Sequence, residues 1–203
     1  MSFEPIPQQI INAGSVRGTA NAYGVRRDGQ WVMTSWQDYV GQVKAAARSL
    51  IALGVEPGEA VTILGSNTPE WVIFDVAAMA VGATPAGIYP TNAPEECAYV
   101  VEHSRSPVML VQNQIQLDKI LATWGDLPNL RTVVLMPGTS SDVDGVMTWD
   151  EFIARGADVE MDAIDGRLSA LGPRDPATLI YTSGTTGPPK AVVLPHEAMV
   201  SLI

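Results

Sequence analysis

Short apolar runs alternate with segments of helical periodicity along most of this 203-residue chain. Residues 60–64 form one such run and are followed by glycine, a pattern typical of a strand buried on both faces. Between residues 36 and 53, apolar side chains recur at the spacing of one helix face. Strands that alternate with helices in this way require right-handed crossovers and a mostly parallel sheet. We therefore predict an α/β fold, a doubly wound and mostly parallel sheet with helices on both faces.

The same pattern gives approximate bounds for each element. Strands are predicted at residues 31–34, 60–64, 83–89, 107–111, 132–135, 177–181 and 191–194. Helices are predicted at residues 36–53, 68–82, 94–104, 115–123, 149–154 and from about 196 onward. The first 30 residues are expected to be irregular and rich in turns, residues 137–145 to form a polar loop, and residues 156–175 to form an acidic linker. We divide the chain into an N-terminal α/β subdomain, residues 1–176, and the start of a second unit, residues 177–203.

Composition excludes several classes of protein. The 46% of hydrophobic residues rules out a disordered chain, and the net charge of −10 argues against a nucleic-acid binder. A single cysteine, Cys97, excludes an intrachain disulfide and a cysteine-based zinc site, and we expect it to be a buried small hydrophobe. With only His103 and His196, neither a Ser-His-Asp triad nor a zinc site is predicted. We expect His103 at a helix end and His196 in a helix-start hydrogen bond.

No segment has the character of a signal peptide or a membrane span. The N-terminus lacks a basic region followed by an apolar one. The longest apolar stretch, residues 71–83, is interrupted by Asp75 and falls short of the roughly 20 residues that a spanning helix needs. We expect a cytoplasmic protein with Trp31, Trp36 and Trp71 packed at the edges of elements. Peripheral contact with a membrane is left open, although no basic amphipathic stretch favours it.

The densest chemical signal is the segment of residues 181–190, which reads Tyr-Thr-Ser-Gly-Thr-Thr-Gly-Pro-Pro-Lys and overlaps the end of a predicted strand. Glycines let the backbone turn sharply, so that successive N–H groups can point at one anion. Hydroxyl groups add donors, and Lys190 offers a positive charge to a phosphate oxygen. The order of residues predicts a polyphosphate-binding loop. The alternative is an ordinary surface loop rich in small polar residues.

This segment differs from the common P-loop. In a Walker A motif, Gly-Lys-Ser/Thr is needed, whereas here Lys190 follows two prolines and precedes Ala191. A second predicted strand follows in place of a helix, so capture of phosphate by a helix dipole is not expected.

The segment resembles the phosphate-binding signature of the adenylate-forming superfamily, which reads Tyr-Thr-Ser-Gly-(Ser/Thr)-Thr-Gly-X-Pro-Lys-Gly. All of it is present except the final glycine, which is Ala191 here. Residues 53–61, 67–71 and 82–85 also resemble family segments in the expected places. Residues 87–91, Gly-Ile-Tyr-Pro-Thr, are similar to long-chain fatty acyl-CoA synthetases, especially those of the bubblegum type.

The resemblance implies an acid–thiol ligase that joins ATP and a fatty acid to give an acyl-adenylate and pyrophosphate. The acyl group then passes to coenzyme A, and Mg²⁺ neutralises the triphosphate. In this family the loop holds the β- and γ-phosphates of ATP. By alignment of the motif, that role falls on Thr182, Ser183, Gly184, Thr185, Thr186, Gly187 and Lys190.

Other motifs that the resemblance implies are missing. The aromatic-X-Thr-Glu motif, the ribose-binding aspartate and the later lysine of the family do not occur in these 203 residues, so no catalytic or metal-binding residue is assigned. Because the last predicted helix stops on apolar residues, we expect a piece of a longer protein that is inactive alone and self-associates. The alternatives are an acyl-AMP ligase or peptide-synthetase adenylation domain, and a non-catalytic nucleotide-binding or remnant module.

Overall fold

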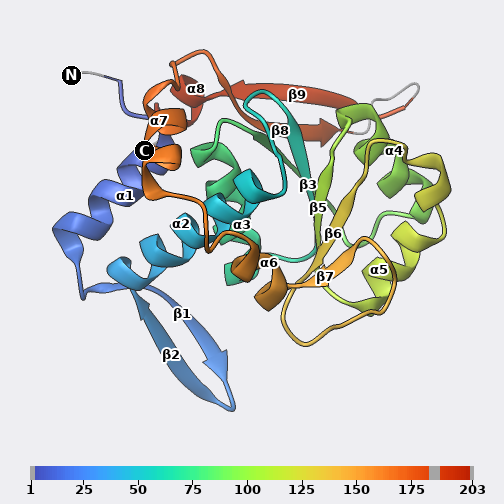
Figure 1. Ribbon diagram of the computed structural model, residues 1–203, viewed down its shortest axis with the longest axis horizontal. Helices are drawn as coiled ribbons and strands as arrows, with labels where there is room; N and C mark the ends of the chain where they lie inside the picture. The colour runs from blue at the N-terminus through green and yellow to red at the C-terminus, as the bar shows by residue number, and fades with distance from the viewer. Residues whose placement is uncertain (1–2, 183–187, 202–203) are drawn as a thin grey trace.

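A seven-stranded sheet forms the frame of the molecule (Figure 1). The computed structural model describes residues 3–182 and 188–201. Along the sheet the strands follow the order β7-β6-β5-β3-β4-β8-β9, and all neighbours are parallel except the antiparallel pair β8–β9. Their bounds are β3 Ala60–Leu64, β4 Thr84–Ile88, β5 Val108–Val111, β6 Thr132–Leu135, β7 Val146–Thr148, β8 Pro176–Thr182 and β9 Lys190–Pro195. The predicted mostly parallel sheet is confirmed.

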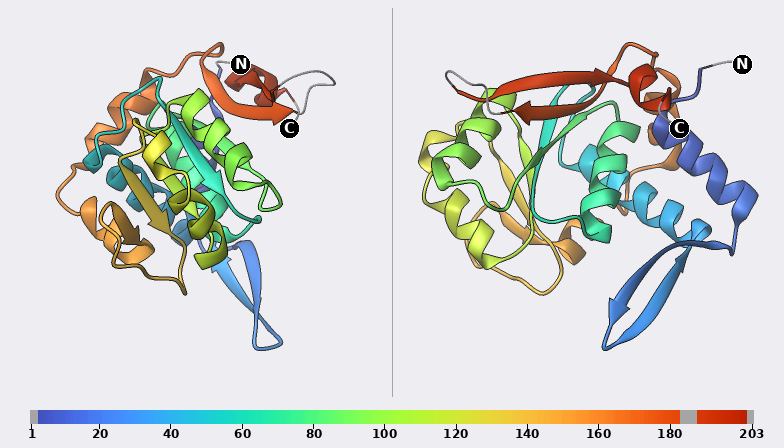
Figure 2. Two further views of the ribbon diagram at one scale, coloured as in Figure 1. Left: turned by 90° about the vertical axis from the view of Figure 1, so that its right-hand side faces the viewer. Right: turned by 180° about the vertical axis from the view of Figure 1, so that it is seen from behind.

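Helices cover both faces of this sheet (Figure 2). They are α1 Ile6–Arg17, α2 Trp36–Ala52, α3 Pro69–Ala80, α4 Pro94–Ser104, α5 Gln114–Leu121, the 3-10 turn η1 Trp124–Asp126, α6 Trp149–Arg155, α7 Met161–Ser169 and α8 His196–Val200. Helices α2, α3 and α6 enclose one core, and α4 and α5 enclose the other. Strand β5 contributes Val108 and Leu110 to the first core and Met109 and Val111 to the second, as alternation along a strand requires. The doubly wound arrangement is confirmed.

Capping residues mark the ends of several helices. The hydroxyl oxygens of Ser35, Thr68 and Thr148 each accept a hydrogen bond from the backbone N–H three residues later, at the starts of α2, α3 and α6. Gly54 follows α2 with a φ of 72°, a left-handed conformation that glycine adopts without strain. No helix within the described ranges is both long enough and apolar enough to cross a bilayer.

The prediction of an irregular N-terminus is wrong. Residues 6–17 form α1, and β1, Asn21–Arg27, pairs with β2, Gln30–Ser35, in a two-stranded hairpin that projects from the rest of the molecule (Figure 1). Of the residues in α1, only Ile6 and Pro7 are buried, so the helix carries little apolar periodicity and depends on its packing against α2. Trp31 on this hairpin is 68% exposed, contrary to the expectation that it packs.

The expected acidic linker, residues 156–175, contains helix α7. This helix buries only Ile164 and Leu168, and its N-cap residue, Glu160, makes no capping hydrogen bond. Strand β7 likewise has no counterpart among the predicted strands, because its three residues are all half-buried. Both elements are held by tertiary contacts that local sequence signals do not report.

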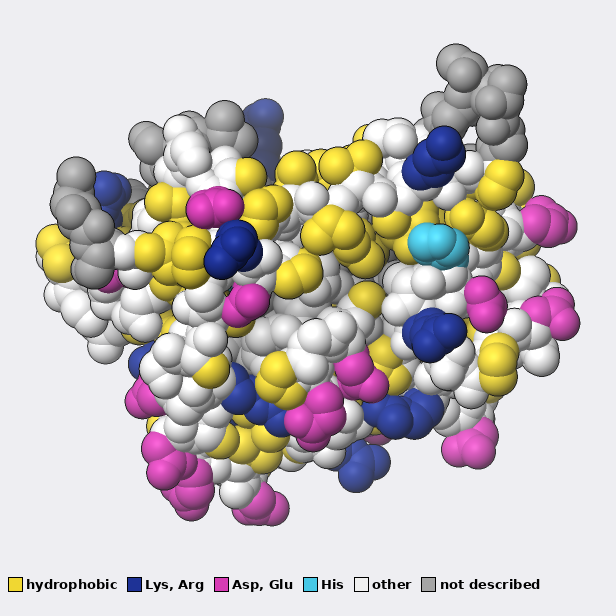
Figure 3. All heavy atoms as spheres, turned by 90° about the horizontal axis from the view of Figure 1, so that it is seen from above, with side chains coloured by type: hydrophobic (Ala, Val, Ile, Leu, Met, Phe, Trp, Pro, Cys, Tyr) yellow, Lys and Arg dark blue, Asp and Glu magenta, His cyan; other side chains and the backbone are white. Residues whose placement is uncertain are grey.

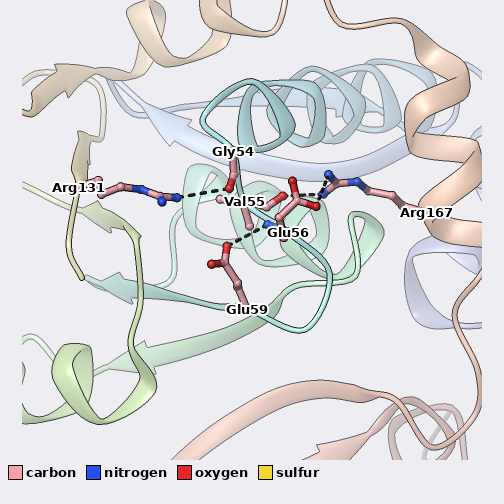
Figure 4. A network of polar contacts seen from close by, with 6 residues as sticks. All are labelled: Gly54, Val55, Glu56, Glu59, Arg131 and Arg167. Atoms are coloured by element: carbon pink, nitrogen blue, oxygen red, sulfur yellow. Dashed lines mark hydrogen bonds and ion pairs between the residues drawn. The ribbon is translucent and has the colours of Figure 1, made fainter. Parts of the chain in front are cut away.

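Arginine side chains tie distant segments to the turn between α2 and β3 (Figure 4). Arg167 on α7 donates hydrogen bonds to the backbone oxygen of Val55 at 2.6 Å and to the carboxylate of Glu56 at 3.2 Å. Arg131, just before β6, donates to the backbone oxygen of Gly54 at 3.3 Å. The backbone N–H of Glu56 in turn donates to the carboxylate of Glu59 at 2.9 Å. This turn, part of the family-like segment 53–61, therefore anchors α7 to the first core.

Candidate phosphate-binding site

The β8–β9 hairpin brings the two outermost described members of the predicted phosphate loop together. Thr182 ends β8, Lys190 begins β9, and the two residues are directly paired in the antiparallel ladder. Side chains that face each other in such a pair project from the same face. Both residues are exposed, and no ion pair to Lys190 occurs within the described ranges. A hydroxyl and an ammonium group on one exposed face are donors of the kind that phosphate oxygens accept.

The other five predicted members of the loop, Ser183, Gly184, Thr185, Thr186 and Gly187, lie outside the described residues. Their assignment to phosphate binding stays a prediction. The hairpin fixes where the segment starts and where it ends.

Helix α4 contacts the hairpin beside both of these ends. The hydroxyl of Tyr99 donates a hydrogen bond to the backbone oxygen of Pro189 at 2.9 Å. Nδ1 of His103 lies 2.9 Å from the hydroxyl oxygen of Tyr181 in a hydrogen bond. Tyr181 is half-buried, and this burial raises the pKa of its hydroxyl group. The sequence predicts His103 at the helix end but gives no sign of its contact with Tyr181.

A cavity of about 290 Å³ lies next to β8, where β3 and β4 end. Parallel sheets commonly bind ligands outside the carboxyl ends of their strands. The indole of Trp71 lines this cavity, and a Cβ atom at Gly87 would lie 3.3 Å from it. The lining residues are Gly65, Asn67, Trp71, Gly87, Ile88, Tyr89, Thr178, Leu179, Ile180 and Tyr181. Since Tyr181 also precedes Thr182, the cavity adjoins the predicted loop.

The sequence profile of the family described as AMP-binding enzyme matches residues 14–203, nearly the whole chain. The chain belongs to this family. The long-chain-fatty-acid–CoA ligase ACSBG2 of Xenopus laevis is 38% identical over 186 residues, a match that covers 88% of this chain and 25% of the relative. ACSBG1 of Rattus norvegicus, also named a long-chain-fatty-acid–CoA ligase, is 35% identical over 193 residues, covering 95% of this chain and 27% of the relative.

Among solved structures, the acetoacetyl-CoA synthetase from Streptomyces lividans is similar, with a TM-score of 0.81 at 26% identity. That match covers 95% of this chain and 30% of the synthetase. The present AMP-binding chain therefore spans about a quarter of the length of the curated relatives it matches, whose coverage is 25% and 27%.

In this AMP-binding chain, His196 is fully buried at the start of α8. Its backbone N–H donates to the oxygen of Asp175 at 3.0 Å, so the expected helix-start hydrogen bond is made by the backbone. Neither ring nitrogen has a hydrogen-bond partner within the described ranges. Burial lowers the pKa of His196, which keeps the ring neutral near pH 7. His196 therefore packs in the interior, at the end of β9 opposite to Lys190.

Cys97 and the acidic residues offer no metal site of their own. Cys97 is buried in the second core as expected, and burial raises its pKa to about 11, so the thiol is protonated at neutral pH. Across residues 3–182 and 188–201, no three His, Cys, Asp or Glu side chains are grouped so that they could hold a metal ion. The described part of the site is therefore one of hydrogen-bond donors and a single positive charge.

Proposed function

We propose that this chain is the N-terminal part of an ATP-dependent long-chain fatty acid–CoA ligase, an enzyme that forms an acyl-adenylate and transfers the acyl group to coenzyme A. Membership of the AMP-binding family and the names of the two similar relatives support this proposal. In it, residues 1–176 are the N-terminal subdomain, and residues 177–203 begin the unit that carries the phosphate loop.

The loop holds the β- and γ-phosphates of ATP in this proposal. The observation that carries it is the pairing of Thr182 with Lys190, which puts a hydroxyl and an ammonium group on one exposed face, on either side of the predicted loop. Hydroxyl and backbone donors of residues 183–187 add to this set. Their chemical task is electrostatic, because negative charge builds on the pyrophosphate leaving group as the acid attacks the α-phosphate.

Magnesium accompanies the triphosphate in the same proposal. Mg²⁺ keeps several water ligands and commonly binds substrate phosphates with few protein ligands. The described residues bring no acidic cluster together, so we assign none of them as a ligand of this ion. Coenzyme A enters only in the second half-reaction, and no described residue is assigned to it.

Isothermal titration calorimetry of the 203-residue chain with Mg-ATP tests the loop assignment. We expect Lys190→Ala and Thr185→Ala each to weaken binding about tenfold or more, since each removes a phosphate contact worth about 1.4 kcal/mol. Lys190→Arg should retain part of the affinity. The control Arg26→Ala removes an exposed positive charge from β1 and should leave the affinity unchanged. Wild-type affinity in both loop variants would contradict the assignment, and no binding by the wild type would favour a remnant module.

Ligase activity is expected to be absent from these residues alone, because the family motif for adenine and magnesium does not occur among them. Acyl-CoA formed from fatty acid, ATP and coenzyme A by the purified chain would overturn this expectation.

A further inference from the structure

One helix face contacts both ends of the segment that carries the predicted phosphate loop. Tyr99 and His103 lie four residues apart on α4, so their side chains stand next to each other on one face. Tyr99 bonds to Pro189, just after the segment of residues 183–187, and His103 bonds to Tyr181, just before Thr182. The end of β8 and the start of β9 lie beside α4 in the ribbon views (Figures 1 and 2).

The three aromatic rings fix one another's orientation. Tyr99 and His103 are stacked, with ring centroids 5.4 Å apart and an angle of 26° between the planes. His103 meets Tyr181 edge to face, at 5.7 Å and 85°. Rings held in this way lose little further freedom when their polar atoms form hydrogen bonds. The arrangement is therefore suited to holding the hairpin in one position relative to α4.

Each hydrogen bond is made to a residue that directly precedes a predicted phosphate ligand, to the backbone of Pro189 and to the side chain of Tyr181. The oxygen of Pro189 belongs to the same planar peptide as the N–H of Lys190, so the Tyr99 hydroxyl fixes the plane from which Lys190 extends. Tyr181 precedes Thr182 directly in β8. The buried residues of α4 are Cys97, Val100 and Val101, and the ring of Tyr99 packs against the same core, whereas His103 is exposed. The hydroxyl of Tyr99 and the ring of His103 thus have no evident part in the core itself.

We propose that Tyr99 and His103 are positioning residues that hold the two ends of the phosphate-binding segment, so that Thr182 and Lys190 meet a bound nucleoside triphosphate in one geometry. This inference rests on the proposed function, because it takes the segment to bind the phosphates of ATP. It assigns to α4 a task in nucleotide binding without contact with the nucleotide.

The test compares variants that remove single contacts in the whole 203-residue chain. Tyr99→Phe removes only the hydroxyl and keeps the ring. His103→Leu removes the polar ring, and His103→Asn restores a polar atom near the position of Nδ1. The control is Tyr23→Phe, because the hydroxyl of Tyr23 makes an equivalent hydrogen bond, 2.9 Å to Gln42, on the distant β1–β2 hairpin.

Two measurements separate positioning from general stability. Hydrogen–deuterium exchange of peptides from residues 176–195, without nucleotide, reports whether the hairpin is held. Calorimetry with Mg-ATP reports affinity, and the thermal midpoint is recorded for each variant. We expect Tyr99→Phe and His103→Leu to speed exchange in these peptides and to weaken Mg-ATP binding roughly three- to tenfold. His103→Asn should regain most of the affinity, and Tyr23→Phe should change neither readout, whatever its effect on the midpoint.

The outcomes distinguish this inference from the function on which it rests. Unchanged exchange in the α4 variants would show that the helix does not hold the hairpin and would overturn the inference. Faster exchange with wild-type affinity for Mg-ATP would also overturn it, while leaving the proposed function intact. If the wild-type chain bound no Mg-ATP, the proposed function itself would fail and the positioning role with it.

Discussion

At the scale of single residues, the charge that is hardest to accommodate is Asp75. It interrupts the apolar α3 and is half-buried there, between the buried residues Phe74 and Val76. Burial raises the pKa of Asp75 to about 7. Burial, followed by the nearby Asp75, also raises the pKa of Tyr39 on α2 to about 12. Because the carboxyl group favours its protonated form in the fold, it opposes folding when it is ionised.

We predict that Asp75→Asn stabilises the protein in a pH-dependent way. Below about pH 4, Asp75 is protonated in both the folded and the unfolded chain. As the pH rises toward 7, the unfolded chain loses this proton first, so the wild type loses stability that the variant keeps. The difference in free energy of unfolding should grow from near zero below pH 4 to about 4 kcal/mol above pH 7, because each unit of the rise in pKa contributes about 1.4 kcal/mol.

Urea unfolding at several pH values measures this difference. The control is Asp158→Asn, which changes an exposed carboxyl group without a hydrogen bond within the described ranges. An Asp75→Asn advantage that is equal at pH 4 and pH 8 would contradict the account.

At the scale of elements, the boundaries of helices and strands are predicted most accurately where local sequence signals are strong. The buried run of β3 and the proline at the start of α4 predict residues 60–64 and 94–104, as observed. Elements that bury few side chains, such as α1 and α7, escaped prediction because packing against α2 supplies their stability. The same reason limits prediction of the site: Thr182 and Lys190 follow from a contiguous motif, whereas the Tyr99 and His103 contacts join residues 90 and 78 positions apart.

Two glycines in residues 156–175, the predicted linker, test how closely this segment packs against α2. A Cβ at Gly156 would lie 2.6 Å from the backbone nitrogen of Ser49 on α2, whereas one at Gly166, within α7, would meet nothing within 4 Å. We predict that Gly156→Ala costs about 1–3 kcal/mol of stability through overpacking. Gly166→Ala should add about 0.5–1 kcal/mol, since alanine favours the helix. Thermal or urea unfolding checks both, and similar effects of the two substitutions would count against this close packing of residue 156 on α2.

At the scale of the whole molecule, the β8–β9 hairpin leaves apolar side chains exposed to solvent. Ile180, Val192 and Val193 are 44%, 44% and 53% exposed. Figure 3, which views the molecule from above relative to Figure 1, shows hydrophobic side chains gathered on that face. Exposed apolar clusters of this kind commonly mark a contact surface. The chain also covers only 25% and 27% of two relatives, whose remaining lengths have no counterpart in it.

We predict that the 203-residue chain self-associates through this hairpin. Light scattering should give an apparent mass that rises with concentration above the 21.6 kDa of the monomer. Val193→Thr combined with Ile180→Thr should reduce the effect, because it lowers the exposed apolar area. Val16→Thr on α1, where Val16 is 85% exposed, is the matched control. A monodisperse monomer at all concentrations would contradict the prediction.

The central claim is that Thr182 and Lys190, the paired residues at the end of β8 and the start of β9, bind the phosphates of ATP. Amide resonances of Thr182 and Lys190, followed by NMR in the isotope-labelled chain, test it most directly. We predict that both shift on titration with Mg-ATP and with Mg-pyrophosphate, and shift far less with AMP, which lacks the β- and γ-phosphates. Shifts confined to other parts of the sheet, or equal responses to AMP and Mg-ATP, would contradict the claim.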